Sequence, residues 1–215
     1  MSKVYLWMTV GLTLTALTAW IVGHTEALVA TLFSSPVIPI VLFVGELGLV
    51  IALSAAIHKM SAQTATLLFL LFSLLNGLTL ATIFLVYTTA SIANAFLSTA
   101  GMFGAMTVYG TVTKRDLTSL GSFLFMGLIG LVIASLINLF LANPMMDLII
   151  SCVGVLVFTL FTAYDTQKLR EFGAEAPLDD SQAVQRGAIL GALTLYLDFI
   201  NLFISLLRLF GGNRD

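Results

Sequence analysis

Two aspartates in apolar segments near the carboxyl end of the chain are the residues best suited to carry chemistry. Asp198 lies in the middle of the run 195–203, LYLDFINLF, and Asp165 closes the preceding apolar segment in the run 164–167, YDTQ. A carboxylate in hydrocarbon costs several kcal/mol unless it is protonated, paired or facing a polar cavity. Two carboxyl groups in contact cannot both ionise cheaply, so such a pair shares one proton. The two acids are therefore the best functional lead in the sequence, and if they touch, their contact is sensitive to pH.

A third acid, Glu46, lies midway through another apolar segment, between Gly45 and Gly48. One interpretation is a protonated acid that is hydrogen-bonded to a neighbouring helix, and the other is a gate or a contact for a permeating cation. Calcium prefers carboxylate and carbonyl oxygens, which such an interior can offer. We therefore treat Glu46 and Asn201, which shares a helix face with Asp198, as candidate contacts for a permeating cation. No cofactor and no dedicated metal site are predicted.

The composition places these acids in a membrane protein. Of the 215 residues, 59% are hydrophobic and 9% are charged, whereas a soluble domain carries roughly 25% charged residues. Apolar stretches of about 20 residues are long enough to cross a bilayer as helices. Seven such stretches occur, at residues 4–22, 37–57, 64–87, 92–112, 117–141, 145–164 and 187–210. The sequence predicts an all-α integral membrane protein with one seven-helix transmembrane domain over residues 1–215, a central last helix and a loop at 168–186.

The Lys and Arg residues predict how the chain is oriented in the membrane. Seven of the nine precede the first predicted span or follow the second, fourth and sixth, and the other loops between spans carry none. Because positive charge is retained on the cytoplasmic side, the amino terminus and the 168–186 loop are predicted to be cytoplasmic. An odd number of spans puts the carboxyl terminus outside, but Arg208 and Arg214 argue for the opposite side, so its side stays open. The seven residues are Lys3, Lys59, Lys114, Arg115, Lys168, Arg170 and Arg186.

Small and polar residues follow one face of each of the last two predicted spans. Such a stripe faces other helices or water rather than lipid. Close helix packing accounts for its Gly, Ser and Thr residues, but not for two aspartates. Asparagines in other spans are interpreted as interhelical hydrogen-bond partners. The stripes are Asp147, Ser151, Gly154, Thr162 and Asp165 in one span, and Gly187, Gly191, Thr194, Asp198, Asn201 and Ser205 in the other; the asparagines are Asn76, Asn94 and Asn138.

Other classes of protein fit the sequence less well. The first apolar run is longer than the roughly 7–15-residue core of a signal peptide, so it is expected to remain as a helix. An intramembrane aspartyl protease also pairs Tyr-Asp on one helix with Asp on the next, but its Gly-x-Gly-Asp and Pro-Ala-Leu elements are missing. No Gly-x-Ser-x-Gly or Ser-His pairing supports a serine protease, so no catalytic residue is predicted. A proton-coupled transporter would favour a repeated architecture, which the sequence lacks.

The paired-aspartate motifs, YDTQ at 164–167 and LYLDFINLF at 195–203, closely resemble those of the Bax inhibitor family (transmembrane Bax inhibitor motif proteins). Two further runs are similar to the same family, TAGMFG at 99–104 and KRDL at 114–117. The similarity covers nearly the whole chain and points to the bacterial inner-membrane branch. One departure is in the third span, where many members carry a proline after a Gly-Leu-Thr-Leu-like run and this chain has Ala81 and Thr82.

The resemblance implies a seven-helix bundle whose last helix is surrounded by the others. It also implies a pH-sensitive calcium leak through the bacterial inner membrane, in which Asp165 and Asp198 share a proton as a latch near the cytoplasmic face. Glu46 matches the position of a family glutamate. In an alternative that stays open, the protein does not conduct but binds other membrane proteins, such as a quality-control protease. The expected partners are the lipid bilayer, calcium ions and, in that alternative, membrane proteins, with no nucleic acid.

The predicted latch raises a question of distance. Asp165 is only three residues from Lys168, which places it near the membrane interface. Asp198 lies twelve residues beyond Arg186, which corresponds to about 18 Å along a helix. The two acids are therefore expected to meet only if the last helix begins outside the bilayer or tilts strongly.

Overall fold

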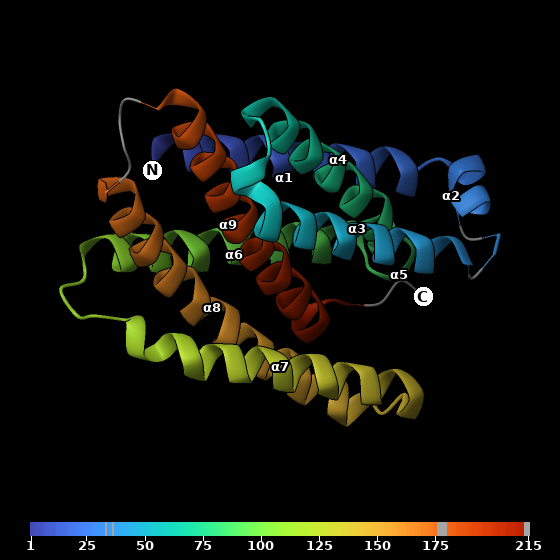
Figure 1. Ribbon diagram of the computed structural model, residues 1–215. Coiled ribbons are helices and arrows are strands. Elements are labelled where there is room, and N and C mark those ends of the chain that lie inside the picture. Colours follow the sequence, from blue (N-terminus) through green and yellow to red (C-terminus); the bar gives the residue numbers. More distant parts are fainter. Residues whose placement is uncertain (33, 36, 176–179, 213–215) are drawn as a thin grey trace. The chain divides into compact units, whose positions relative to one another are not determined.

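Helices account for almost all of the described chain (Figure 1). This computed structural model describes residues 1–32, 34–35, 37–175 and 180–212. Seven segments of this part are long and apolar enough to cross a membrane, so the predicted all-α membrane protein with seven transmembrane helices is confirmed. The elements are α1 (Ser2–Gly23), α2 (Glu26–Leu32), α3 (Val37–Ala56), the short 3-10 helix η1 (Ile57–Lys59), α4 (Ala62–Leu80), α5 (Ile83–Val86), α6 (Thr89–Val112), α7 (Thr118–Leu141), α8 (Pro144–Glu175) and α9 (Ser181–Phe210).

The two helices that carry the aspartates are longer than the sequence predicted. α8 continues to Glu175 and α9 begins at Ser181, so most of the predicted loop at 168–186 is helical; residues 176–179 lie outside the described part. The predicted bounds were wrong because the charged residues were taken as a turn, whereas Lys, Arg, Gln and Glu are good helix formers. Asp165 and Asp198 therefore lie well inside long helices. The distance expected from a membrane interface at residue 168 no longer separates them.

The third span is interrupted although it carries no proline. α4 ends just before a turn at Ala81 and Thr82, and α5 then continues the span. The N–H of Ala81 is shared between two carbonyl groups of the preceding turn, and the Thr82 hydroxyl donates to the Thr79 carbonyl oxygen at 3.0 Å. Such sharing and back-bonding tighten the last turn and weaken the regular α-helical ladder. The break therefore arises from local hydrogen bonds rather than from a proline.

The described chain divides into two compact units. The first unit comprises Met1–Tyr87 and Glu175–Tyr196, and the second comprises Thr88–Ala174 and Leu197–Asn213, as far as these ranges are described. α9 supplies its first half to one unit and its second half to the other. It is the most buried of the described spans. In its most apolar stretch of 18 residues 67% of the residues are buried, whereas the corresponding share is 11% to 33% in the other spans. Such burial is expected of a helix that packs against protein on most of its faces.

In the first unit, α1 and α4 pack closely because glycines face the partner helix. A Cβ at Gly77 of α4 would lie 2.8 Å from the Thr15 carbonyl oxygen of α1, and a Cβ at Gly11 would lie 2.6 Å from the Phe69 ring. Small residues at such positions let two helix backbones approach each other. The Thr15 hydroxyl can therefore reach across to the Ser73 carbonyl oxygen, at 2.7 Å.

In the second unit, the carboxyl end of the chain is hydrogen-bonded to the start of α6. The Thr88 N–H donates to the Gly212 carbonyl oxygen at 3.3 Å, and the Gly212 N–H donates to Ser91 Oγ at 3.0 Å. The end of α9 therefore lies at the same membrane face as the connection that precedes α6. Near this end, Arg208 lies 3.6 Å from Asp147 at the start of α8. Arg208, one of the two arginines that had argued for the opposite side, is therefore ion-paired, and the other, Arg214, lies outside the described residues.

Cysteine labelling of intact cells should place this shared face on the outer side of the membrane. We expect an impermeant thiol reagent to label a cysteine at Thr89 from outside, and one at Ser181 only after the membrane is opened. Asn213, outside the described residues, directly follows Gly212, so a cysteine there should behave like the one at Thr89. A Cys152→Ser background removes the native thiol.

Two results would contradict these assignments. The reverse pattern at Thr89 and Ser181 would overturn the orientation that the Lys and Arg residues predict. Labelling of Asn213 together with Ser181, and not with Thr89, would overturn the shared membrane face.

Candidate functional site

The two aspartates predicted as a pair meet in the second unit. Asp165 is on α8 and Asp198 is on α9, and their carboxyl groups are within hydrogen-bonding reach of each other. Asp198 is buried and Asp165 is half-buried. Lys168, one turn further along α8, is near enough to Asp165 to attract its carboxylate. The structure thus brings the two predicted residues together and adds a cation on the more exposed side of the pair.

The contact between these two acids depends on a proton. Carboxylate oxygens only accept hydrogen bonds, so two ionised acids cannot bond to each other. Within the described residues, no side-chain or backbone donor is hydrogen-bonded to the buried Oδ2 atom of Asp198. The carboxyl group of Asp165 can fill that role only while the pair holds a proton. The arrangement can therefore bind one proton between α8 and α9, and it loses the contact when the proton leaves.

Glycines bring the helices of the second unit close together beside the pair and further along α8 and α9. A Cβ at Gly110 of α6 would overlap the carbonyl oxygen of Ala163 on α8, two residues before Asp165. A Cβ at Gly154 of α8 would lie 2.6 Å from Ser205 Oγ on α9. Gly154 and Ser205 belong to the two polar stripes predicted from the sequence, so those stripes meet here. The pair is therefore positioned by close packing of helix backbones.

Gln167, which the sequence analysis did not single out, fastens the loop before α7 to α8. Its side chain is buried, accepts a hydrogen bond from the Leu117 N–H at 2.9 Å and donates to the Arg115 carbonyl oxygen at 2.8 Å. Arg170, one turn further, donates to the Thr111 carbonyl oxygen. A buried amide is costly without partners, so the amide at the end of the YDTQ run was the signal that could have identified this role.

Glu46 lies in the first unit, where it is buried and hydrogen-bonded. Thr79 donates to Glu46 Oε1 at 2.5 Å, and the Asn76 amide donates to Oε2 at 3.1 Å. The Tyr196 hydroxyl donates to Asn76 Oδ1 at 2.9 Å and lies 2.7 Å from the Thr15 hydroxyl. Asn76 was predicted to link helices, which is confirmed. Thr79 was missed, although its spacing of three residues from Asn76 places both on one helix face.

Asn201, the other candidate contact for a permeating cation, is bonded within its own helix. Its amide Nδ2 donates to the Leu197 carbonyl oxygen at 2.8 Å, and the side chain is half-buried. This bond leaves the amide oxygen as the atom that a cation could contact. The role of Asn201 in permeation stays a prediction, as does that of Glu46.

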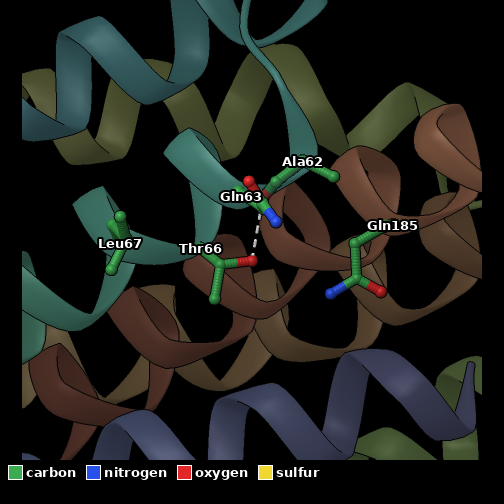
Figure 2. Close-up of a pocket in the computed structure, with 5 residues that line it drawn as sticks. All are labelled: Ala62, Gln63, Thr66, Leu67 and Gln185. Carbon is green, nitrogen blue, oxygen red and sulfur yellow. Dashed lines mark hydrogen bonds between the residues drawn. The ribbon is translucent and has the colours of Figure 1, made fainter.

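A pocket of about 500 Å³ lies in the first unit, beside the amino-terminal ends of α4 and α9. Figure 2 shows it lined by amide, hydroxyl and apolar side chains, with the Thr66 hydroxyl bonded to the Ala62 carbonyl oxygen at 2.9 Å. None of the predicted site residues lines this pocket. The acids are therefore held in packed helix contacts, not in this surface pocket.

The similarity to known proteins extends over the whole chain. A family model described as "Inhibitor of apoptosis-promoting Bax1" matches residues 1–215. The chain is 53% identical over 214 residues to "Inner membrane protein YbhL" of Escherichia coli, with 100% of this chain and 92% of that protein covered. It is 43% identical over 215 residues to an uncharacterised protein of Borreliella burgdorferi, with 100% and 92% covered. It is 41% identical over 215 residues to an uncharacterised protein of Rickettsia prowazekii, with 100% and 90% covered.

Proposed function

The chain belongs to the Bax inhibitor family, and from that premise we propose that it is a pH-sensitive cation leak channel of the inner membrane, with calcium as the permeant ion. The observation that carries this proposal is the contact of Asp165 and Asp198 between α8 and α9. Ionisable residues inside membrane spans are costly and usually serve transport or signalling. The inner-membrane location of the Escherichia coli relative supports the assigned membrane.

In the proposed gate, the proton shared by the two aspartates holds α8 against α9. When the pH rises and that proton leaves, two negative charges face each other. Two unit charges about 4 Å apart repel by about 4 kcal/mol at an effective dielectric constant of about 20. Conformations of one protein commonly differ by only a few kcal/mol, so this repulsion is large enough to separate the helices. At low pH both acids are neutral, and the contact loses the extra strength of a charge-assisted hydrogen bond.

The proposal is tested with liposomes that contain only the purified protein and a trapped calcium indicator. We expect calcium entry at a rate that depends on pH. Asparagine keeps the size of aspartate but cannot ionise, so Asp165→Asn and Asp198→Asn should each flatten the pH profile.

Asp116→Asn, in the loop before α7, is the matched control for these two substitutions. Hydrogen bonds from the Thr118 hydroxyl and N–H lower the pKa of Asp116, so this acid stays ionised across the series. Asparagine can still accept the bond from the Thr118 N–H, which is 2.8 Å long. The control should therefore keep the pH profile of the unmodified protein.

Two outcomes would count against the proposed function. An unchanged pH profile in both pair variants would remove the aspartates from the gate. Absence of calcium entry at every pH, from vesicles whose protein is folded, would overturn conduction and favour a protein that modulates other membrane proteins.

A further inference from the structure

A chain of hydrogen-bonding groups leads away from Glu46 through the first unit, and the proposed gate does not use it. The contacts run from Glu46 Oε2 to the Asn76 amide at 3.1 Å and on to the Tyr196 hydroxyl at 2.9 Å. They continue to the Thr15 hydroxyl at 2.7 Å, which in turn donates to the Ser73 carbonyl oxygen at 2.7 Å. Glu46, Tyr196 and Thr15 are all buried. The protein groups themselves must therefore supply the protons for these bonds.

The available protons do not suffice while Glu46 is ionised. An ionised carboxylate only accepts, so Asn76 must turn its N–H toward Glu46 and its oxygen toward Tyr196. Tyr196 then gives its single hydroxyl proton to Asn76, and Thr15 can give its single proton either to the Ser73 carbonyl oxygen or to the Tyr196 hydroxyl. One of these two contacts, each 2.7 Å long, is therefore left without a proton. One bond of the chain stays unmade.

A proton on Glu46 completes the same chain without moving the helices. The oxygen and nitrogen of an asparagine amide exchange places when the amide rotates by half a turn. Protonated Glu46 can then donate to Asn76 Oδ1, and the amide N–H donates to the Tyr196 hydroxyl. Tyr196 in turn donates to Thr15, whose own proton still reaches the Ser73 carbonyl. Every contact in the chain then holds one proton.

We propose that Glu46 is a proton-binding site whose proton sets the direction of the whole hydrogen-bond chain. With the proton bound, the contact between Tyr196 of α9 and Thr15 of α1 is a hydrogen bond. When the proton leaves, the Asn76 amide reverses and Tyr196 donates to Asn76 instead. Thr15 can then bond to Tyr196 or to the Ser73 carbonyl oxygen, but not to both. The site joins α1, α3, α4 and the first half of α9 within the first unit.

The described elements around Glu46 carry few other titratable groups. α3 has no second one, α4 has none, and Tyr196 is the one on the facing turn of α9. Asp198 follows Tyr196 by two residues on α9, and its carboxyl group contacts Asp165. The remaining groups lie ten or more residues from the nearest chain member on the same helix or on the helix that leads into it, which is about 15 Å or more along a helix. These remote groups are Lys3, Tyr5, His58, Lys59, Arg186 and Arg208.

Infrared difference spectroscopy of the purified protein in lipid, titrated between acid and alkaline pH, tests this site. The carbonyl stretch of a protonated carboxylic acid that disappears in Glu46→Gln identifies the Glu46 signal. We expect this signal in the unmodified protein and its loss as the pH rises. A spectrum in which Glu46→Gln removes no protonated-acid signal at any pH would overturn the proposal.

Two isosteric substitutions should move the midpoint of this titration in opposite directions. Thr15→Val removes the acceptor that Tyr196 needs only in the protonated chain, so the midpoint should fall. Thr79→Val removes a donor that bonds more strongly to an ionised Glu46, so the midpoint should rise. Each shift should be roughly one pH unit, since one hydrogen bond changes the balance in each case.

Matched controls are Thr9→Val on α1 and Thr66→Val on α4, whose hydroxyls bond only within their own helices. Both should leave the midpoint unchanged. Thr15→Ala tests the same loss of acceptor with a smaller side chain, should valine at this position prevent folding. Shifts of Thr15→Val and Thr79→Val in the same direction, or no shift in either, would show that the chain does not reverse with the proton.

Discussion

Alanine in place of Gly110 is expected to destabilise the protein by roughly 1–3 kcal/mol, the usual cost of forcing extra volume into a packed interface. A Cβ at this position would overlap the carbonyl oxygen of Ala163 and lie 3.1 Å from its carbonyl carbon. A backbone carbonyl cannot rotate away as a side chain can. α6 and α8 would therefore have to separate close to Asp165. Thermal unfolding of the purified protein in detergent measures the effect as a lowered Tm.

Gly104, on the same helix, supplies the control for this substitution. A Cβ at Gly104 would meet nothing within 4 Å, and alanine favours a helix over glycine by about 1 kcal/mol. Gly104→Ala should therefore leave the Tm unchanged or raise it. Equal losses of stability at Gly104 and Gly110 would contradict the close packing of α6 on α8.

A second large effect is expected when one member of the aspartate pair is removed without the other. Asp165→Leu leaves Asp198 buried with an oxygen that no described donor satisfies, and such a group costs about 1–3 kcal/mol. Replacing both partners by apolar residues of similar size is often neutral or stabilising. The double variant should therefore be more stable than the single one, and a double-mutant cycle measures the coupling as a difference in unfolding free energy.

Asp147 provides a matched acid for this cycle, since it is also on α8 but its side chain is 46% exposed and pairs with Arg208. An exposed ion pair contributes about 0–1 kcal/mol. Asp147→Leu should therefore change stability little and add independently to Asp198→Leu. If Asp165→Leu and Asp198→Leu were equally additive, their carboxyl groups would not be in contact. A stable double variant would mean that the pair is retained for its response to protons and not for stability.

The membrane fold could be predicted from the sequence because a bilayer demands long apolar runs, and such runs are visible in composition alone. The ends of the helices could not. Hydropathy detects where hydrocarbon begins, not where a helix stops, so the helical residues of 168–175 and 181–186 were assigned to a loop. The break at Ala81 and Thr82 was invisible for a similar reason, because it comes from shared hydrogen bonds. α2 was missed because seven residues are too few to leave a periodic pattern.

The aspartate pair could be predicted because acids in apolar spans are rare and each one needs a partner. Periodicity shows which residues share a helix face, but it does not show which helix lies opposite. Asn76 was therefore expected to link two helices, while its partners Glu46 and Tyr196 could not be named. The role of Gln167 was missed for a related reason. Its amide at the end of the YDTQ run signals that partners exist, but those partners are backbone groups, which side-chain patterns do not identify.

The bonds that hold Gly212 to the start of α6 also decide what can be attached to the end of the chain. A domain fused after Asp215 would begin three residues beyond an anchored backbone, at the face from which α6 starts. On the predicted orientation this face is outside, where disulfides form and persist. A reporter enzyme that needs disulfides would be active there, whereas a label meant for the cytoplasm belongs at the amino terminus, seven spans away.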